Sequence, residues 1–287
     1  MVTLDEGGFG GEFRSIFRPP PALERFVEHS WIQEHPRDID GSSRSLRIIP
    51  DASPHLLLHV FRPSPEGPTR RPRLALVGPR TVYVDSPLVA RRHTVGIRLR
   101  PGTLPLLTGL PASDLTDRSA RLDEVAGCAD PELRERIVDG LDPEASRLGM
   151  LAWLTETLIH SRDIDWRIRC AWQHVRSSGG VGSVRGLSEV TGISRRTLQN
   201  VVRAEVGLGP KRMSRIVRLQ EALTRALSEP GRAWSRIATA SGYCDQAHLI
   251  HDVQELLGES PERFRARGLV EGVADSYKRP DRDAATL

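Results

Sequence analysis

The sequence ISRRTLQNVVRAEVGLGP, residues 193–210, decides the fold of the last third of the chain, because its plan recurs about 50 residues later. The second copy is YCDQAHLIHDVQELLGESP, residues 243–261. In each copy a short helix is expected to end at a glycine, Gly192 or Gly242, before a second helix. Helix, glycine turn and second helix form the unit that places one helix in a DNA major groove. Two units predict a domain that reads two successive grooves.

The first unit carries the signals of two capped helices. Ser183 can cap the first helix, and Ser194 can cap the second by accepting a hydrogen bond from a backbone N–H. Gly192 supplies the turn, since glycine adopts a positive φ without a Cβ clash. Leu187 and Val190 are expected to face the core. These signals predict a helix-turn-helix unit over residues 183–206.

The outer face of the second helix in this unit is polar. Leu198, Val201 and Val202 are spaced to face inward, which leaves five polar side chains outside. Gln and Asn can pair with an adenine edge, and Arg can pair with guanine or hold a phosphate. A solvated helix face is the alternative interpretation. The five outward residues are Arg195, Arg196, Gln199, Asn200 and Arg203.

A connecting helix is predicted from Pro210 to about Leu227. One side of this helix is expected to be lined by Met213, Ile216, Val217, Gln220 and Leu223, and the other side by Arg212, Arg215, Arg218 and Arg225. A helix of roughly 15 residues spans about 22 Å, and two reading helices need to lie about 34 Å apart. Lys211 and Arg212, at the start of the helix, are candidate phosphate contacts.

The second unit, with the motifs around it, resembles the AraC/XylS family of bacterial transcription regulators. The resemblance covers roughly residues 163–267 and is carried by Ile237-Ala238, Gly242-Tyr243, Asp245-Gln246-Ala247-His248-Leu249, Gly258-Glu259-Ser260-Pro261 and Phe264-Arg265. The N-terminal half is similar to that of a poorly characterised branch of these regulators, through Ile49-Pro50-Asp51, Val77-Gly78-Pro79, residues 96–102 and Leu115-Thr116-Asp117. The resemblance implies double-stranded DNA as partner, with RNA polymerase, a small-molecule effector and a second copy of the chain as further candidate partners.

The chain departs from the family at two positions in each reading helix. The family commonly has Leu-x-Arg-x-Phe there, whereas this chain has Asn200 and Val202, then His251 and Val253. The smaller valines keep the core apolar, while the loss of both arginines weakens the family's contact scheme. The family's DNA-facing positions, carried onto this chain, are Arg195, Arg196, Gln199 and Asn200 in the first unit and Gln246, Ala247, Ile250 and His251 in the second.

Charge is distributed unequally between the two units. Residues 185–236 hold 11 basic and 4 acidic residues, whereas residues 237–262 hold 5 acidic residues and no Arg or Lys. Because phosphate neutralisation supplies much of protein–DNA affinity, we expect the first unit and the connector to dominate binding. His251 beside a phosphate would bind better protonated, so affinity would rise as pH falls through about 6.5; a neutral, hydrogen-bonded histidine is the alternative. The full candidate DNA-binding set is Ser194, Arg195, Arg196, Gln199, Asn200, Arg203, Lys211, Arg212, Gln246, Ala247, Ile250 and His251.

The N-terminal half has the pattern of an α+β domain. Short β-rich runs at residues 45–49, 55–61, 74–77, 81–84 and 93–99 predict a small antiparallel barrel or roll. Helices are expected at residues 21–31, 104–107, 122–126, 132–138 and 144–160, the last with an apolar stripe that includes Leu148, Leu151 and Ile159. We therefore expect an effector-sensing or self-association domain at residues 1–160 and an all-α double helix-turn-helix domain at residues 163–267. Residues 268–287 are expected to be a disordered tail.

Composition limits the alternatives. The 287 residues include three scattered cysteines and have a net charge of +4, with only two lysines. No apolar run is long enough for a membrane span or a signal peptide, so a cytoplasmic location and no membrane partner are expected. His55 and His59 share one face of a strand, but packing histidines explain them better than a metal site. The sequence has no nucleotide-binding, nucleophile or zinc motif, so no catalytic residue, metal or cofactor is predicted.

The leading interpretation is a non-enzymatic transcription regulator controlled through its N-terminal half. Two alternatives remain. The N-terminal half could be an enzyme fused to a DNA-binding half, or the helical half could have lost DNA binding and become a protein-interaction module.

Overall fold

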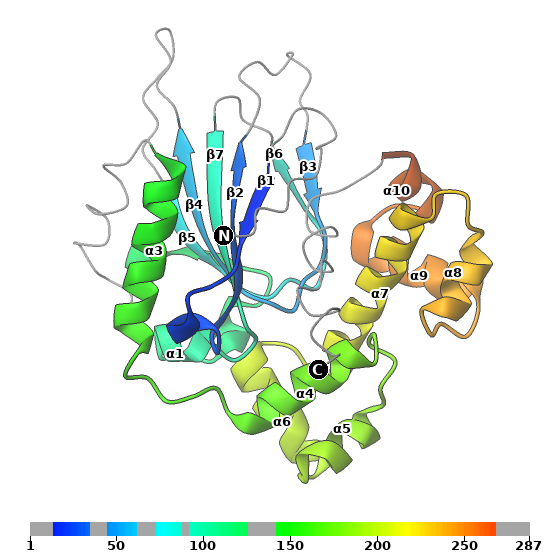
Figure 1. The fold of residues 1–287 in the computed structure, drawn as a ribbon. Coiled ribbons are helices and arrows are strands. Elements are labelled where there is room, and N and C mark those ends of the chain that lie inside the picture. Colours follow the sequence, from blue (N-terminus) through cyan, green and yellow to red (C-terminus); the bar gives the residue numbers. More distant parts are fainter. Residues whose placement is uncertain (1–13, 35–44, 62–72, 88–91, 126–141, 268–287) are drawn as a thin grey trace, which may run out of the picture.

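The N-terminal half is built on an antiparallel sheet. The structure, a computed structural model, describes residues 14–34, 45–61, 73–87, 92–125 and 142–267. Six strands pair in the order β1-β2-β7-β4-β5-β8 (Figure 1), and β3 pairs with β6 in a separate ribbon. The strands are β1 Arg14–Phe17, β2 Val27–Glu34, β3 Ser45–Ile48, β4 His55–Phe61, β5 Arg73–Val77, β6 Val84–Pro87, β7 Arg92–Leu99 and β8 Ser119–Arg121. The predicted α+β class is confirmed, and the sheet does not close into a barrel over the described residues.

The helix α3 (Pro143–Leu158) packs against β2 and β7. Its buried side includes Met150, Leu151 and Leu154. The predicted stripe is wrong at both ends, since Leu148 is 53% exposed and Ile159 is 51% exposed. The helix itself is where the periodicity places it, and its buried side includes Leu151 from the middle of the predicted stripe.

The predicted helix over residues 21–31 is also wrong. Only Pro21–Leu23 forms a short 3-10 helix, η1. The chain then enters β2, which pairs with β1 on one side and β7 on the other. A short apolar run fits either state locally, and here the hydrogen bonds of the sheet determine the outcome.

Short elements complete the N-terminal half. These are α1 Leu104–Thr108, η2 Ala112–Leu115 and η3 Leu122–Glu124. The strand predicted at residues 81–84 instead begins at Val84, because Asp117 accepts hydrogen bonds from the backbone and the hydroxyl of Thr81. The helix predicted at residues 132–138 and the tail predicted at residues 268–287 lie outside the described residues.

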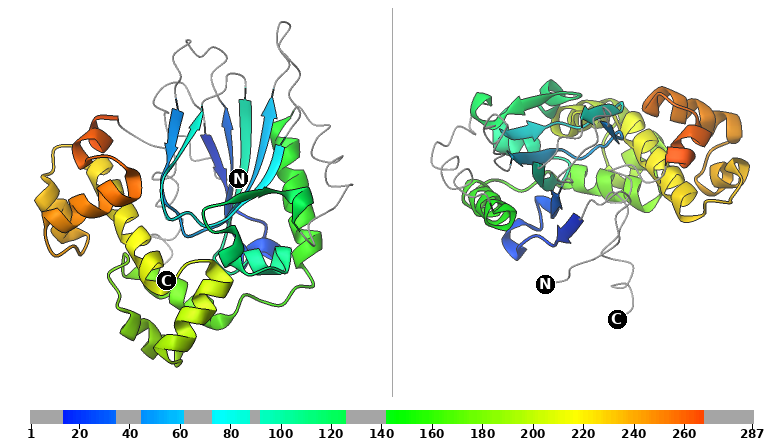
Figure 2. Two further views of the ribbon diagram at one scale, coloured as in Figure 1. Left: turned by 180° about the vertical axis from the view of Figure 1, so that it is seen from behind. Right: turned by 90° about the horizontal axis from the view of Figure 1, so that it is seen from above.

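The C-terminal half is helical. It consists of α4 Trp166–Ser177, α5 Val184–Thr191, α6 Arg195–Val206, α7 Pro210–Ser228, α8 Trp234–Ala240, α9 Gln246–Leu257 and α10 Pro261–Arg267. The first unit, α5 and α6 with α4, lies below one end of the sheet. The second unit, α8 and α9, lies beside β3 and β6 (Figures 1 and 2). The helix α7 connects the two units.

The two halves are joined by a buried ionic cluster. Arg98 on β7 donates to Glu28 on β2 (2.7 Å) and to Asp51. Arg176 on α4 donates to the same Glu28 carboxylate at 3.0 Å, and so does the indole N–H of Trp172 at 3.3 Å. Burial raises the pKa of Glu28, but the charges of Arg98 and Arg176 outweigh that effect and hold the pKa at about 2. Glu28 therefore attaches α4 to the sheet as a carboxylate.

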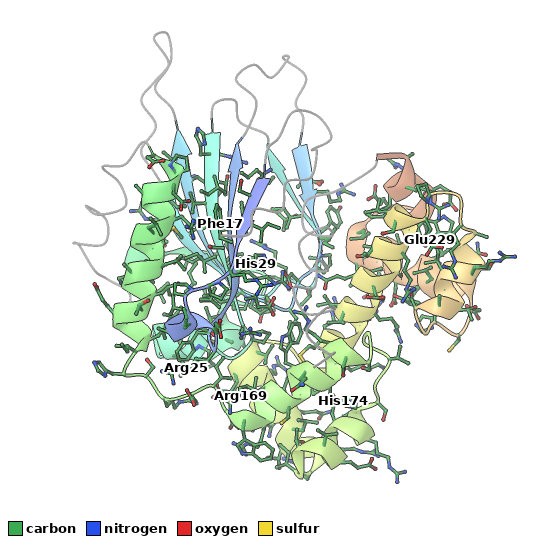
Figure 3. All side chains as sticks on the ribbon, in the orientation of Figure 1. Phe17, Arg25, His29, Arg169, His174 and Glu229 are labelled. Atoms are coloured by element: carbon green, nitrogen blue, oxygen red, sulfur yellow. The ribbon has the colours of Figure 1, made fainter. Side chains whose placement is uncertain are left out.

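Exposed ion pairs lie along the link between α3 and α4. Arg25, which follows η1, is 2.5 Å from Asp163, and Arg169 of α4 is 3.8 Å from the same carboxylate (Figure 3). All three side chains are about half exposed. Such pairs add little stability, so the buried Glu28 cluster is the stronger joint.

Candidate nucleic-acid interface

The first unit has the capped geometry that its sequence predicts. The Ser183 hydroxyl accepts a hydrogen bond from the Gly186 amide (3.0 Å), and the Ser194 hydroxyl accepts one from the Thr197 amide (3.2 Å). Gly192 has a φ of 66°, in the left-handed region. Side-chain caps at both helix starts and a glycine between them fix the angle at which α6 leaves the turn.

The apolar side of α5 differs from the prediction at one position. Leu187 is fully buried, but Val190 is 50% exposed. Thr191 is buried in its place, with its hydroxyl donating to the Leu187 carbonyl (2.7 Å). Of the residues predicted to face inward on α6, Leu198 and Val202 are fully buried and Val201 is half-buried.

The second unit repeats this geometry with a different cap. The Asp245 carboxylate accepts a hydrogen bond from the His248 amide (2.7 Å), and Leu249 is fully buried. Gly242, at φ 73°, makes the turn. A Cβ on Gly242 would lie 2.3 Å from Cγ2 of Val181, whereas a Cβ on Gly192 would meet nothing within 4 Å. Gly242 therefore serves both the turn and a close contact with the loop after α4.

The outer face of α6 presents cations without partners. Arg195, Arg196 and Arg203 are exposed and make no ion pair with any residue that the structure describes. Gln199 and Asn200 are exposed beside them. The structure thus brings all five predicted outward side chains to the surface. Free guanidinium groups next to amides are suited to contact both phosphates and base edges.

The outer face of α9 mixes polar and apolar side chains and has no lysine or arginine. Gln246, Ala247 and His251 are exposed, and Ile250 is half-buried. The side chain of His251 is 70% exposed, with its Nε2 3.4 Å from Oε2 of Glu255. This face therefore carries little positive charge.

The connector arginines pair with α9 instead of pointing into solvent. Arg215 donates to Asp252 at 2.7 Å and to Glu255 at 2.7 and 2.5 Å, and Arg218 is 3.5 Å from Asp252. Arg212 lies 3.2 Å from Glu255. Hydrogen bonds from Arg215 lower the pKa of Glu255 to about 2. The arginines therefore lie on the predicted side of α7, where Arg212, Arg215 and Arg218 meet α9 and Arg225 pairs with Glu221 of α7 itself.

The first of the two predicted sides of the connector lies in the core. Met213, Ile216, Val217, Gln220 and Leu223 are all buried. The amide of Gln220 donates to the Pro50 carbonyl of the sheet half (2.7 Å). At the start of the helix Lys211 is exposed, while Arg212 also donates to the Thr81 carbonyl (3.3 Å). Of the two predicted phosphate contacts, Lys211 is therefore the available cation.

Comparison with known proteins agrees with this geometry. Residues 187–267 match the model of a helix-turn-helix domain. The C-terminal half carries an AraC-type helix-turn-helix domain. Residues 15–121 match the model of a domain of unknown function (DUF6597). None of the curated proteins matches the chain.

Solved structures show loose similarity. The C-terminal domain of AraT, a response regulator from Geobacillus stearothermophilus, is 21% identical, with a TM-score of 0.34 over 41% of this chain and 95% of that one. The xylose-binding transcription activator XylR is 17% identical, with a TM-score of 0.33 over 44% and 39%. ToxT from Vibrio cholerae is 7% identical, with a TM-score of 0.43 over 83% and 97%. At such scores, what those proteins bind says nothing about this chain.

Sequence reasoning missed what the acidic residues of the AraC-type domain do. Asp252 is 1% exposed and lies between two connector arginines. The unequal charge of the two units was the available signal for these ion pairs, because an acidic unit next to a basic helix can pair with it. The sequence alone does not show which residues pair, since Arg215 and Asp252 are 37 residues apart and meet only when α9 packs on α7.

His55 and His59, the two histidines that share one face of a strand, lie among polar neighbours in the sheet half. His59 Nδ1 is 3.1 Å from the Thr94 hydroxyl, and His55 is 3.7 Å from Asp51. Burial lowers the pKa of His59 to about 4, with help from Arg92 and Arg73. Within the described ranges there is no group of three or more His, Cys, Asp or Glu side chains that could hold a metal ion. Those ranges also include no helix long and apolar enough to cross a membrane.

Proposed function

We propose that the protein is a sequence-specific transcription regulator that reads two successive major grooves with α6 and α9. The observation that carries the proposal is the outer face of α6, where unpaired arginines and amides follow a capped glycine turn. In this proposal Arg195, Arg196, Gln199, Asn200, Arg203 and Lys211 contact the first groove and its phosphates, and Gln246, Ala247, Ile250 and His251 contact the second. Ser194 caps α6 at the point where the helix meets the DNA backbone.

The first unit supplies most of the affinity in this proposal. Each phosphate contact releases counterions and steepens the dependence of binding on salt, by about 0.9 in the log–log slope. The first unit has several unpaired cations, whereas the arginines near α9 are engaged by Asp252 and Glu255. The second unit contributes base readout with few phosphate contacts.

The sheet half, residues 1–160, provides control in this proposal, and residues 163–267 bind DNA. A small-molecule effector, a second copy of the chain or RNA polymerase would act by shifting the population of DNA-competent conformations. The buried Glu28 cluster, which attaches α4 to two strands, supports a mechanical connection between the halves.

Selection of binding sites from random DNA at modest salt tests the proposal. Enrichment of one bipartite site is expected. Gel shifts on that site then compare Arg196→Ala with Gln246→Ala at two salt concentrations. Arg196→Ala is expected to weaken binding more and to lower the salt slope by about 1. Arg121→Ala, which removes an exposed arginine of β8 paired with Glu124, is the matched control and should leave binding unchanged.

Two results would count against the proposal. If no sequence is enriched, the proposed function fails and the result favours the alternative of a protein-interaction module. If Gln246→Ala weakens binding as much as Arg196→Ala, the dominance of the first unit is wrong even though DNA binding stands.

A further inference from the structure

Both reading helices end in left-handed glycines that pack against one short segment of the sheet half. The glycines are Gly207 after α6, at φ 88°, and Gly258 after α9, at φ 67°. The segment is residues 79–83, which we call the bridging segment. It connects β5 to β6, and its two ends contact different units.

The first end of the bridging segment contacts the end of α6. A Cβ on Gly207 would lie 2.8 Å from Cγ of Pro79 and 2.7 Å from the Thr116 hydroxyl oxygen. That hydroxyl donates to the Gly207 carbonyl (2.8 Å). Real Cβ atoms do not approach other atoms this closely, so only glycine allows α6 to end here. The contact places the end of the first reading helix directly on the sheet half.

The second end of the bridging segment contacts the end of α9. A Cβ on Gly258 would lie 2.4 Å from the ring of Tyr83. The Tyr83 amide donates to the Leu256 carbonyl (3.0 Å). Arg47 stacks on the Tyr83 ring at 4.1 Å and donates to the Leu257 carbonyl (2.9 Å). Two carbonyls of the last turn of α9, which have no partner within the helix, are thereby satisfied by the sheet half.

The middle of the bridging segment is fixed to its own half. Asp117 accepts hydrogen bonds from the amide and the hydroxyl of Thr81, both at 2.6 Å, and its own amide donates to the Pro79 carbonyl (2.9 Å). Asp117 is at φ 57°, the one positive φ outside glycine in the part of the chain that the structure describes. The Thr81 carbonyl accepts from Arg212 of the connector. The segment is thus held at both ends and in the middle.

We propose that the bridging segment fixes the separation and orientation of α6 and α9, and so determines which half-site spacing the protein accepts. This inference rests on the proposed function. If α7 were the only connection, each unit could still bend and twist relative to α7 at the end where it is attached. A second connection between the helix ends removes that freedom. Because each added base pair moves a half-site by about 3.4 Å and about 35° around the DNA axis, a rigid pair of units should reject altered spacings.

The experiment measures spacing selectivity in the full chain. The selected bipartite site is prepared with its natural spacing and with one base pair removed or added. The wild-type protein is expected to bind the altered DNAs at least about tenfold more weakly, as when one unit loses its contacts. Tyr83→Ala should reduce this penalty to about threefold or less. Tyr83→Phe keeps the ring and should retain wild-type selectivity, as should Val82→Ala, which changes an exposed residue of the same segment.

A second variant addresses the contact at Gly207, which both Pro79 of the bridging segment and Thr116 make. Thr116→Val keeps the shape of the side chain and removes the hydrogen bond to Gly207, so it is also expected to relax spacing selectivity. It provides the test if Tyr83→Ala does not fold. Arg196→Ala should weaken binding to all three DNAs equally and leave their ratios unchanged. That result would separate a loss of affinity from a loss of spacing selectivity.

The outcomes separate the two proposals. A wild-type protein that binds all three spacings equally, or Tyr83→Ala and Thr116→Val variants with wild-type ratios, would overturn the role of the bridging segment while DNA binding stands. If site selection enriches no sequence, the proposed function fails, and the bridging segment has no spacing to determine.

Discussion

Replacing Asp252 with asparagine should destabilise the second unit far more than replacing an exposed acidic residue of the same region. The Asp252 carboxylate is 1% exposed, 2.7 Å from Arg215 and 3.5 Å from Arg218. Removing one partner of a buried ion pair costs about 3–5 kcal/mol. Arg215 keeps its bonds to Glu255, and both arginines retain some solvent contact, so we expect about 2–3 kcal/mol.

The matched control is Glu262→Gln. Glu262 is exposed on α10 and makes no ion pair with any described residue, so the same change of charge should alter stability by less than about 0.5 kcal/mol. Urea unfolding gives the free energies, and hydrogen exchange of α9 shows where stability is lost. A loss of 2–3 kcal/mol corresponds to about 5–10 °C in Tm for a chain of this size. Equal effects from Asp252→Asn and Glu262→Gln would refute the reasoning.

Three further perturbations test the joints of the fold. The pKa of Glu28 is lower in the folded state than in the unfolded state, so the wild-type protein should lose up to about 3 kcal/mol of stability as pH falls from about 4.5 to 2. In acid unfolding experiments Glu28→Gln should not show this loss. The pKa of His59 in the folded state is also lowered, to about 4, so the wild-type protein should lose up to about 3 kcal/mol of stability as pH falls from 6.5 to 4. His59→Gln should make stability nearly independent of pH over this interval. The same pH dependence in His59→Gln as in wild type would contradict the lowered pKa. Gly192→Ala should lower the free energy of unfolding by about 1 kcal/mol because of its left-handed backbone, and Gly242→Ala should lower it clearly more because its Cβ would meet Val181. Equal melting temperatures of the two variants would show that the loop around Val181 moves aside.

Signals contained in a few consecutive residues were predictable from the sequence. The Ser194 cap and the Gly192 and Gly242 turns need only local backbone geometry, and all are present in the structure. The apolar residues of α7 were also found, because a long helix gives several turns of periodicity. Short segments were less predictable. Residues 21–31 are compatible with a helix or a strand, and the sheet decides between them.

Contacts between distant segments were not predictable. The side of α5 that is buried depends on where its neighbours lie, which is why Val190 was placed wrongly. Tyr83 and Gly258 are 175 positions apart in the chain, and no local pattern links an aromatic residue after β5 to the end of α9. The motif residues Pro79 and Thr116 were noticed in the sequence, but their contact with Gly207 appears only once the halves are docked.

The formal charge of the second unit overstates how strongly it repels DNA. Asp252 and Glu255 are neutralised by connector arginines, Glu259 is buried 3.9 Å from Arg47, and Asp245 caps α9 with its carboxylate on a backbone amide. Among the described acidic residues after α8, this leaves Glu262 as the one without a partner. Much of the negative charge of the second unit is therefore paired within the fold, and the first unit offers more unpaired positive charge at its surface. In the proposed function, attraction is concentrated at α6, so the spacing that we propose the sheet half fixes would determine whether α9 reaches the second groove.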